Sequence, residues 1–261
     1  MAIAPTFKLN LRILISFNSS LLGLSATPGR TWNDPDADIE LSKFFDKQKV
    51  TLQVEGYDNP VDYLVESGYL AKVKNVPLLY KSGFEISEND LTYLKANFQL
   101  SDRFIKNLSE DQQRNILIIQ KVEELLTRHQ RVILFAMNVE HSNLLATCLQ
   151  ARNINAFSIT SNTESGQRRR LIDLFKSEDE RAMVLCNYGI LTTGFDAPKT
   201  SCALISRPTD SLVLYSQMVG RAIRGPKAGG SKEAEIVTVV DTCLPGFDAV
   251  ANAFFNWEDV W

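Results

Sequence analysis

The sequence predicts an α/β fold in which helices cover both faces of a parallel sheet. From residue 131 onward, short apolar segments alternate with segments of helical periodicity, and the apolar segments are continuous instead of alternating with polar residues. Strands of this kind are typical of parallel sheets that are buried on both faces. We therefore expect each strand to reach the next through a right-handed crossover.

The individual elements of this second half follow from where the apolar periodicity changes. Polar turn residues separate the segments, so each strand is expected to end in a loop. The expected strands are 132–137, 156–159, 182–186, 201–206 and 236–241, and the expected helices are 140–152, 164–176 and 211–224.

The first half of the chain has a less regular pattern. An apolar run at 21–25 is closed by Pro28-Gly29, which favours a buried strand that ends in a turn. Residues 86–129 contain neither glycine nor proline and are polar and helical, with helix starts expected at 87–90 and 109–111. Further expected elements are helices at 6–17, 36–45 and 60–67, a strand at 50–54 and an extended segment at 71–80.

Composition narrows the classes of function. The 261 residues carry a net charge of −3, so a site for nucleic acid would have to be a local basic patch. Four cysteines lie far apart and only two histidines are present, which argues against a zinc site. No apolar run approaches the roughly 20 residues that span a bilayer. We expect a cytoplasmic protein with no membrane partner.

The most informative stretch is 217–224, which contains Gln217, Arg221 and Arg224. On a helix their spacing of i, i+4 and i+7 would place all three side chains on one face. Two guanidiniums and an amide on one face suit an anion such as a polyphosphate. A solvated basic helix face is the plainer alternative.

Four motifs in this order resemble those of superfamily 2 helicases. Residues 217–224 (Q-x-x-G-R-x-x-R) resemble motif VI, and residues 191–198 (L-T-T-G-F-D-A-P) resemble motif V. Residues 24–30 contain the S-A-T of motif III, and residues 132–136 resemble motif IV. The resemblance implies a RecA-like second motor domain, with an N-terminal remnant of the first motor domain and a helical linker before it.

The resemblance also implies roles for single residues. Arg221 and Arg224 would be the catalytic arginines that reach the γ-phosphate of ATP, and Gln217 would support them. The motif V glycine and aspartate would lie at the nucleotide, and its threonines would contact the nucleic acid. The motif III residues would couple the state of the bound nucleotide to the binding of the nucleic acid. These residues are Gly194 and Asp196 for the nucleotide, Thr192 and Thr193 for the nucleic acid, and Ser25 and Thr27 for coupling.

The sequence departs from the family in one respect. It contains neither the P-loop pattern G-x-x-x-x-G-K-[ST] nor a D-E-A-D or D-E-A-H box. The stretch 225–232 is glycine-rich but has the order Gly-Ser-Lys and follows a helix, so we interpret it as a loop. ATP and Mg²⁺ would therefore be held by a P-loop-containing first motor domain. Alone, the chain is expected to bind neither tightly and to hydrolyse ATP negligibly.

Three functions remain open at this stage. The favoured one is the C-terminal part of an ATP-dependent DNA helicase or translocase, because T-x-G-F-D with Q-x-x-G-R-x-x-R is closer to the DEAH-like and restriction-associated branch than to DEAD-box RNA helicases. An RNA helicase fragment and a non-catalytic nucleic-acid-binding or docking module are the alternatives. The expected parts are a remnant at 1–30, linker and accessory helices at 31–112, and the RecA-like domain at 113–261.

Overall fold

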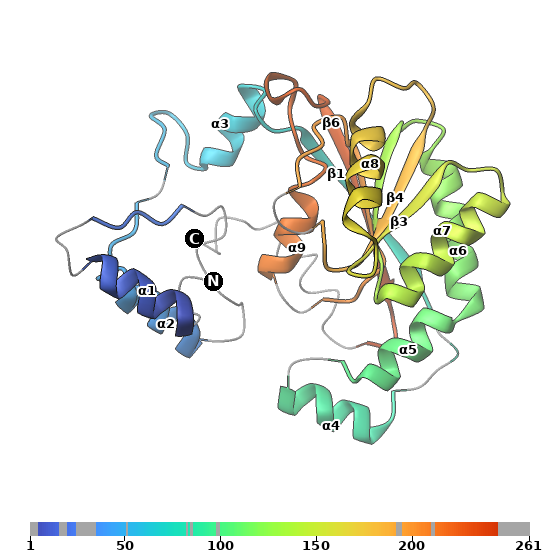
Figure 1. The fold of residues 1–261 in the computed structure, drawn as a ribbon, viewed down its shortest axis with the longest axis horizontal. Coiled ribbons are helices and arrows are strands. Elements are labelled where there is room, and N and C mark those ends of the chain that lie inside the picture. Colours follow the sequence, from blue (N-terminus) through green and yellow to red (C-terminus); the bar gives the residue numbers. More distant parts are fainter. Residues whose placement is uncertain are drawn as a thin grey trace.

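The computed structural model describes residues 5–15, 20–24, 35–50, 52–81, 83, 86–97, 100–191, 195–209 and 212–244. Its centre is a six-stranded sheet in the order β1-β6-β5-β2-β4-β3, in which every pair of neighbours is parallel (Figure 1). The predicted parallel α/β sheet is therefore confirmed. The strands are β1 (Lys72–Tyr80), β2 (Arg131–Phe135), β3 (Ala156–Ile159), β4 (Met183–Asn187), β5 (Cys202–Ile205) and β6 (Glu233–Asp241).

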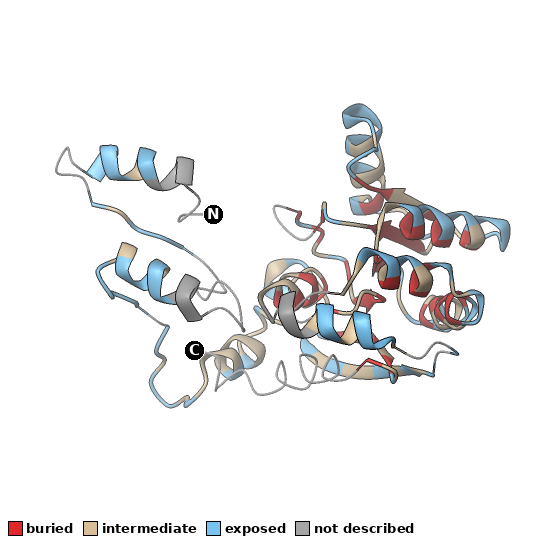
Figure 2. Ribbon diagram, turned by 90° about the horizontal axis from the view of Figure 1, so that it is seen from below, coloured by how far each residue is buried: buried red, intermediate tan, exposed pale blue. Residues whose placement is uncertain are grey.

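Helices cover both faces of this sheet because alternate residues of each strand point in opposite directions. In β2, Ile133 and Phe135 pack with residues of α8 and α9, whereas Val132 and Leu134 pack with residues of α6 and α7. Figure 2 shows the buried residues gathered between these layers. The described helices are α1 (Pro5–Ile15), α2 (Pro35–Phe44), α3 (Pro60–Glu66), α4 (Glu88–Asn97), α5 (Asp102–Glu110), α6 (Gln112–Leu125), α7 (Val139–Ala151), α8 (Ser165–Lys176), α9 (Leu212–Val219) and the 3-10 turn η1 (Pro226–Ala228).

Polar side chains begin several of these helices. Asn59, Ser101, Asp111 and Asn138 each accept a hydrogen bond from a backbone N–H in the first turn of the helix that follows. Such caps satisfy N–H groups that have no partner within the helix. The helix start predicted at 109–111 corresponds to Asp111, which caps α6 directly after α5 ends.

Residues 72–80, which the sequence predicts to be an extended part of the connecting region, form the edge strand β1. All nine residues pair with β6, and Pro77 lies opposite Thr238. A proline is tolerated there because one side of an edge strand needs no hydrogen-bond donors. The segment was recognisable as extended, but its partner is about 160 residues away, so no local pattern could place it in the sheet.

Two strands predicted in the first half are wrong. Residues 20–24 form no strand, and the side chains of Leu22 and Leu24 are 80% and 87% exposed. In the segment 50–54, only Val54 makes a bridge, to Tyr57, while Val50 is 98% exposed. An apolar run forms a stable strand only when a sheet lies beside it. Residues 20–24 lie near α1 and α2, and residues 50–54 lie between α2 and α3, so both segments are apart from the sheet (Figures 1 and 2).

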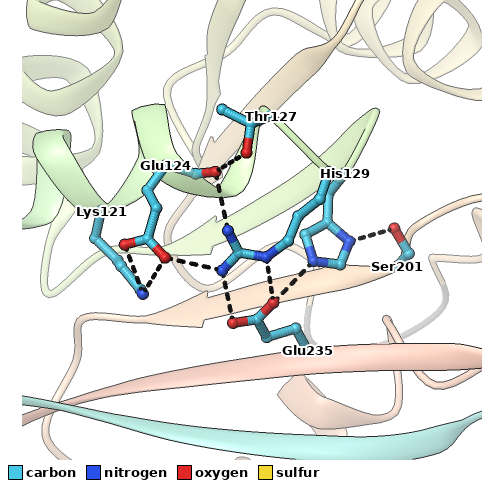
Figure 3. A network of polar contacts seen from close by, with 7 residues as sticks. Lys121, Glu124, Thr127, His129, Ser201 and Glu235 are labelled. Carbon is cyan, nitrogen blue, oxygen red and sulfur yellow. Dashed lines mark hydrogen bonds and ion pairs between the residues drawn. The ribbon is translucent and has the colours of Figure 1, made fainter.

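A network of charged groups stabilises the amino-terminal edge of the sheet (Figure 3). The Glu235 carboxylate of β6 accepts hydrogen bonds from Nε and Nη2 of Arg128 at 2.8 and 2.9 Å and lies 3.1 Å from His129 Nε2. Glu124 extends the network to Lys121. These contacts join the end of α6 to β6.

No helix among the described residues is long and apolar enough to cross a membrane.

Candidate nucleotide-facing arginine site

The candidate site lies on the sheet face that α8 and α9 cover. The loop after β4 returns across this face and places Phe195 and Ala197 in the same core cluster as Tyr215 and Met218 of α9. This packing brings residues 195–197 beside the segment that follows α9. The two sequence motifs around Asp196 and Arg221 are therefore neighbours in space, although 25 residues separate them.

The helix that carries Gln217 is shorter than the sequence predicts. It ends at Val219, so Gln217, Arg221 and Arg224 do not share one helix face, and that expectation is wrong. The Gly220 N–H still donates to Ser216 O, but the next two N–H groups donate to Met218 O and Val219 O, which tightens the chain into turns. Arg224 then pairs with Leu70 in an antiparallel bridge, and extended pairing replaces the helical path.

Arg221 is anchored by the loop after β4. Its guanidinium donates from Nη1 to the backbone carbonyl of Phe195. The side chain is half-buried, and burial lowers its pKa from the ordinary value. The positive charge of Arg224 lowers that pKa further, and the Asp196 carboxylate opposes this effect. Two neighbouring guanidiniums that repel each other form a site that favours a bound anion.

Arg224 is anchored to the next residue along the same loop. Its Nε donates to Oδ1 of Asp196 at 3.2 Å, and the two side chains are 38% and 62% exposed. An ion pair with this exposure contributes little stability, because water competes for both partners. The pair orients the guanidinium and leaves it accessible to an incoming phosphate.

The other predicted site residues have different outcomes. Gln217 lies on α9 and is partly buried. Ser25, Thr27, Thr192, Thr193 and Gly194 lie outside the described residues, so their predicted roles stay predictions. The glycine-rich stretch 225–232 is a loop with the 3-10 turn η1 and joins no strand to a helix, as predicted.

Sequence reasoning missed the groups that hold the two arginines in place. The Phe195 carbonyl and the backbone of residues 68–71 make these contacts. Backbone groups carry no residue-type signal, so the sequence offered no indication of them. Phe195 is apolar and lies between Gly194 and Asp196, which predicts only that its ring is buried.

Chemically, this arrangement suits a polyphosphate. Arg221 and Arg224 present two guanidiniums from adjacent anchoring points, and guanidiniums bind phosphate oxygens through paired N–H groups. Within the described part of the chain, no group of three or more His, Cys, Asp or Glu residues is arranged to hold a metal ion. The two described arginines thus supply positive charge that suits the phosphates of a nucleotide.

The part of the chain that carries the two arginines is similar to a known protein family. Residues 117–226 match the family described as "Helicase conserved C-terminal domain", a range that covers β2 to the arginine segment. Strands β2 to β5 and both arginines fall in that range, whereas β1 and β6 lie outside it. In this range the chain resembles the C-terminal domain of superfamily 2 helicases. The six-stranded parallel sheet of the chain, with helices on both faces, has the fold of a RecA-like second motor domain.

Relatives of the helicase C-terminal domain are considerably longer proteins. A 51.5 kDa protein of Lactococcus phage (isolate 7-9) is 28% identical over 174 residues, which cover 65% of this chain and 37% of the relative. The putative ATP-dependent helicase IRC3 of Saccharomyces cerevisiae is 29% identical over 153 residues, which cover 53% of this chain and 22% of the relative. The chain therefore spans well under half the length of these relatives.

A solved structure shares the fold of the helicase C-terminal domain and much of the chain before it. It is a fragment of a putative HsdR subunit of a type I restriction enzyme from Vibrio vulnificus YJ016. The match has a TM-score of 0.52 at 15% identity and covers 83% of this chain and 43% of that one. At this identity the likeness concerns the fold alone.

Proposed function

We propose that this chain forms the arginine-bearing wall of the ATP cleft in a DNA helicase or translocase. A P-loop-containing first motor domain would hold ATP and Mg²⁺ against it. The observation that carries the proposal is that Arg221 and Arg224 are anchored to the adjacent residues Phe195 and Asp196. Motif V and motif VI are thereby joined into a single preorganised cationic surface.

The residues of this surface fit the triphosphate of ATP. Arg224 is 38% exposed and oriented by a weak ion pair, so a γ-phosphate can replace or share its contact with Asp196. Arg221 lies deeper and donates to a backbone carbonyl, which fixes its position. Preorganised donors of this kind stabilise negative charge that develops during phosphoryl transfer. Gln217 and Gly194 would support the same cleft.

DNA is the favoured nucleic acid, and Thr192 and Thr193 are the residues proposed to contact its backbone. The residues of motifs V and VI support this choice. Their patterns T-x-G-F-D and Q-x-x-G-R-x-x-R differ from the H-R-x-G-R that is typical of DEAD-box RNA helicases. DNA of defined length and RNA of the same sequence separate the two possibilities. The proposal expects the greater stimulation of ATP turnover by DNA.

The central experiment combines this chain with the P-loop motor domain of its parent protein and measures nucleic-acid-stimulated ATP hydrolysis. Arg224→Ala should reduce kcat by about 10³-fold, the lower range for an arginine that acts on a transferring phosphoryl group. Arg169→Ala is the matched control, because that arginine is 87% exposed and pairs only loosely with Asp173. Equal turnover of the Arg224 and Arg169 variants would exclude a catalytic role of Arg224.

The chain alone provides the second half of this test. It should hydrolyse ATP negligibly, because the P-loop lysine and the Mg²⁺-binding acid are not in its sequence. The proposal would be contradicted if the isolated chain hydrolysed ATP and Arg224→Ala abolished that activity, because the chain would then not need the P-loop domain. DNA binding with no turnover when both halves are present would favour the alternative, a non-catalytic binding or docking module.

A further inference from the structure

The segment just before β1 holds the backbone that carries Arg224. Ala71 N–H donates to Ile223 O at 2.9 Å, and Gly225 N–H donates to Tyr69 O at 2.9 Å. These two bonds flank the bridge between Leu70 and Arg224. Arg224 is therefore positioned by its backbone as well as by its side chain, and the pairing residues come from a part of the chain about 155 residues earlier.

Glycines allow the two segments to approach closely. A Cβ atom on Gly225 would lie 2.7 Å from the backbone carbon of Tyr69 and 2.8 Å from that of Gly68, and it would overlap the Gly68 carbonyl oxygen. Real Cβ atoms essentially never approach other heavy atoms so closely, and backbone atoms cannot rotate away. Gly68 itself has a φ of +76°, which a residue with a side chain adopts at a cost.

The pairing segment is itself firmly attached to its neighbours. Tyr69 N–H and Leu70 N–H both donate to Leu64 O of α3, at 2.8 and 3.0 Å. After Ala71, which is 1% exposed, the chain continues directly into β1. A helix on one side and the sheet on the other therefore fix the position of residues 68–71.

Arg224 is also held from its other side. Its carbonyl accepts from Ser231 N–H at 3.0 Å, and a Cβ atom on Gly230 would lie 2.6 Å from the Arg224 carbonyl carbon. The arginine thus lies between residues 68–71 and residues 230–231, with no room for movement toward either.

We propose that residues 68–71 are a positioning clamp that sets Arg224 at the distance from the nucleotide that phosphoryl transfer needs. The proposal rests on the proposed function of Arg224. It adds that the connecting segment between the two motor domains controls the arginine through Gly68 and Gly225. These glycines are positioning residues, because neither is proposed to contact the nucleotide.

The test is Gly225→Ala in the chain combined with its P-loop motor domain. The added methyl group must push Arg224 away from residues 68–69, and a displacement of about 1 Å at a catalytic group can reduce turnover about 10²-fold. We expect kcat to fall by this factor, while KM for ATP and the Kd for DNA change less than about threefold. Gly83→Ala is the control, since a Cβ atom there would meet nothing within 4 Å.

Gly230→Ala serves as a second variant, because it displaces Arg224 from the side opposite residues 68–71. It should lower kcat in the same way, because it pushes Arg224 toward residues 68–71. A folded Gly225→Ala variant with turnover within twofold of the unsubstituted protein overturns the clamp. Arg224→Ala in the same assay separates the two proposals: if that variant is fully active, the proposed function fails and not the clamp alone.

Amide hydrogen exchange on the unsubstituted chain keeps the proposal testable if Gly225→Ala does not fold. The clamp requires that the amides of Ala71 and Gly225 are both protected and that they open together. Exchange of either amide at the rate of an unstructured chain would overturn the proposal, whatever the variants do.

Discussion

Arg114 and Asp241 form an ion pair in which neither side chain is exposed to solvent. Arg114 Nε donates to Oδ1 of Asp241 at 2.7 Å, and Nη2 donates to Oδ2 at 2.9 Å and to the Ser206 carbonyl at 2.7 Å. The pair joins α6 to the carboxyl ends of β5 and β6. A charge buried this completely depends on its partner, because water cannot replace it.

The first prediction follows from that dependence. Asp241→Asn should lower the free energy of unfolding by about 3–5 kcal/mol, because it leaves the Arg114 guanidinium buried without a full counter-charge. Urea denaturation at pH 7 measures the change. Glu123→Gln is the control, because its pair with Arg152 is exposed and should contribute far less. Similar losses for the two variants would contradict a special role of the buried pair.

Arg131 leads to a second stability prediction. The side chain is buried and donates five hydrogen bonds, all to backbone carbonyls: four lie between Phe175 and Arg181, and the fifth is that of Gln130. A lysine keeps the charge but has three donors on one atom and cannot span these carbonyls. Arg131→Lys should therefore lower the free energy of unfolding by about 2–4 kcal/mol. Arg169→Lys, at an exposed position of α8, should change it much less in the same urea titration.

His141 predicts a loss of stability in mild acid. Its Nδ1 must accept from the Met137 N–H at 3.2 Å, so Nε2 carries the proton and donates to Asn115 Oδ1 at 2.9 Å. The ring is therefore neutral. Burial lowers the pKa of His141 to about 3, and the charge of Arg114 adds to this effect. Between this pKa and the ordinary value of 6.5, the unfolded chain binds a proton that the folded chain does not.

Stability should consequently fall as the pH drops from about 6.5 toward 3, by up to about 1.4 kcal/mol for each pH unit. His141→Gln removes the titrating group, so its free energy of unfolding should depend less on pH over this interval. Urea titrations at pH 7, 6 and 5 measure the difference. If the free energy of unfolding depends on pH equally in the unsubstituted chain and the variant, folding does not lower the pKa of His141, and the prediction is wrong.

Glu235 predicts a second, more acidic transition. Its hydrogen bonds from Arg128, and that from His129, lower the pKa of this carboxyl to about 2 from an ordinary value near 4.5. The stabilisation is therefore complete above about pH 4.5 and is lost as the pH falls toward 2. Glu235→Gln should lower the free energy of unfolding by about 2 kcal/mol at pH 7. This is less than the full pKa shift implies, because Arg128 is partly exposed and water screens the ion pair. The two proteins should become equally stable near pH 2.

The sequence predicted those parts of the fold that local patterns determine. Continuous apolar strands such as 183–187 and helical periodicity located most elements after residue 131. Local patterns could not show that β1 joins β6, or that Arg114 meets Asp241 over 127 positions, because these pairings depend on distant partners. For the same reason the helix predicted through Arg224 ends at Val219, where the pairing of Arg224 with Leu70 replaces helical hydrogen bonds.

The last prediction concerns how Asp196 acts in the proposed site. If the carboxylate only orients Arg224, Asp196→Ala should lower kcat about 10-fold in the chain combined with its P-loop motor domain, which is less than Arg224→Ala does. The double variant should then be no slower than Arg224→Ala, because the orienting group has nothing left to orient. Asp173→Ala removes another exposed aspartate that pairs with an arginine and is the control. A double variant at least 10-fold slower than Arg224→Ala would instead indicate that Asp196 contacts the nucleotide or its attacking water independently.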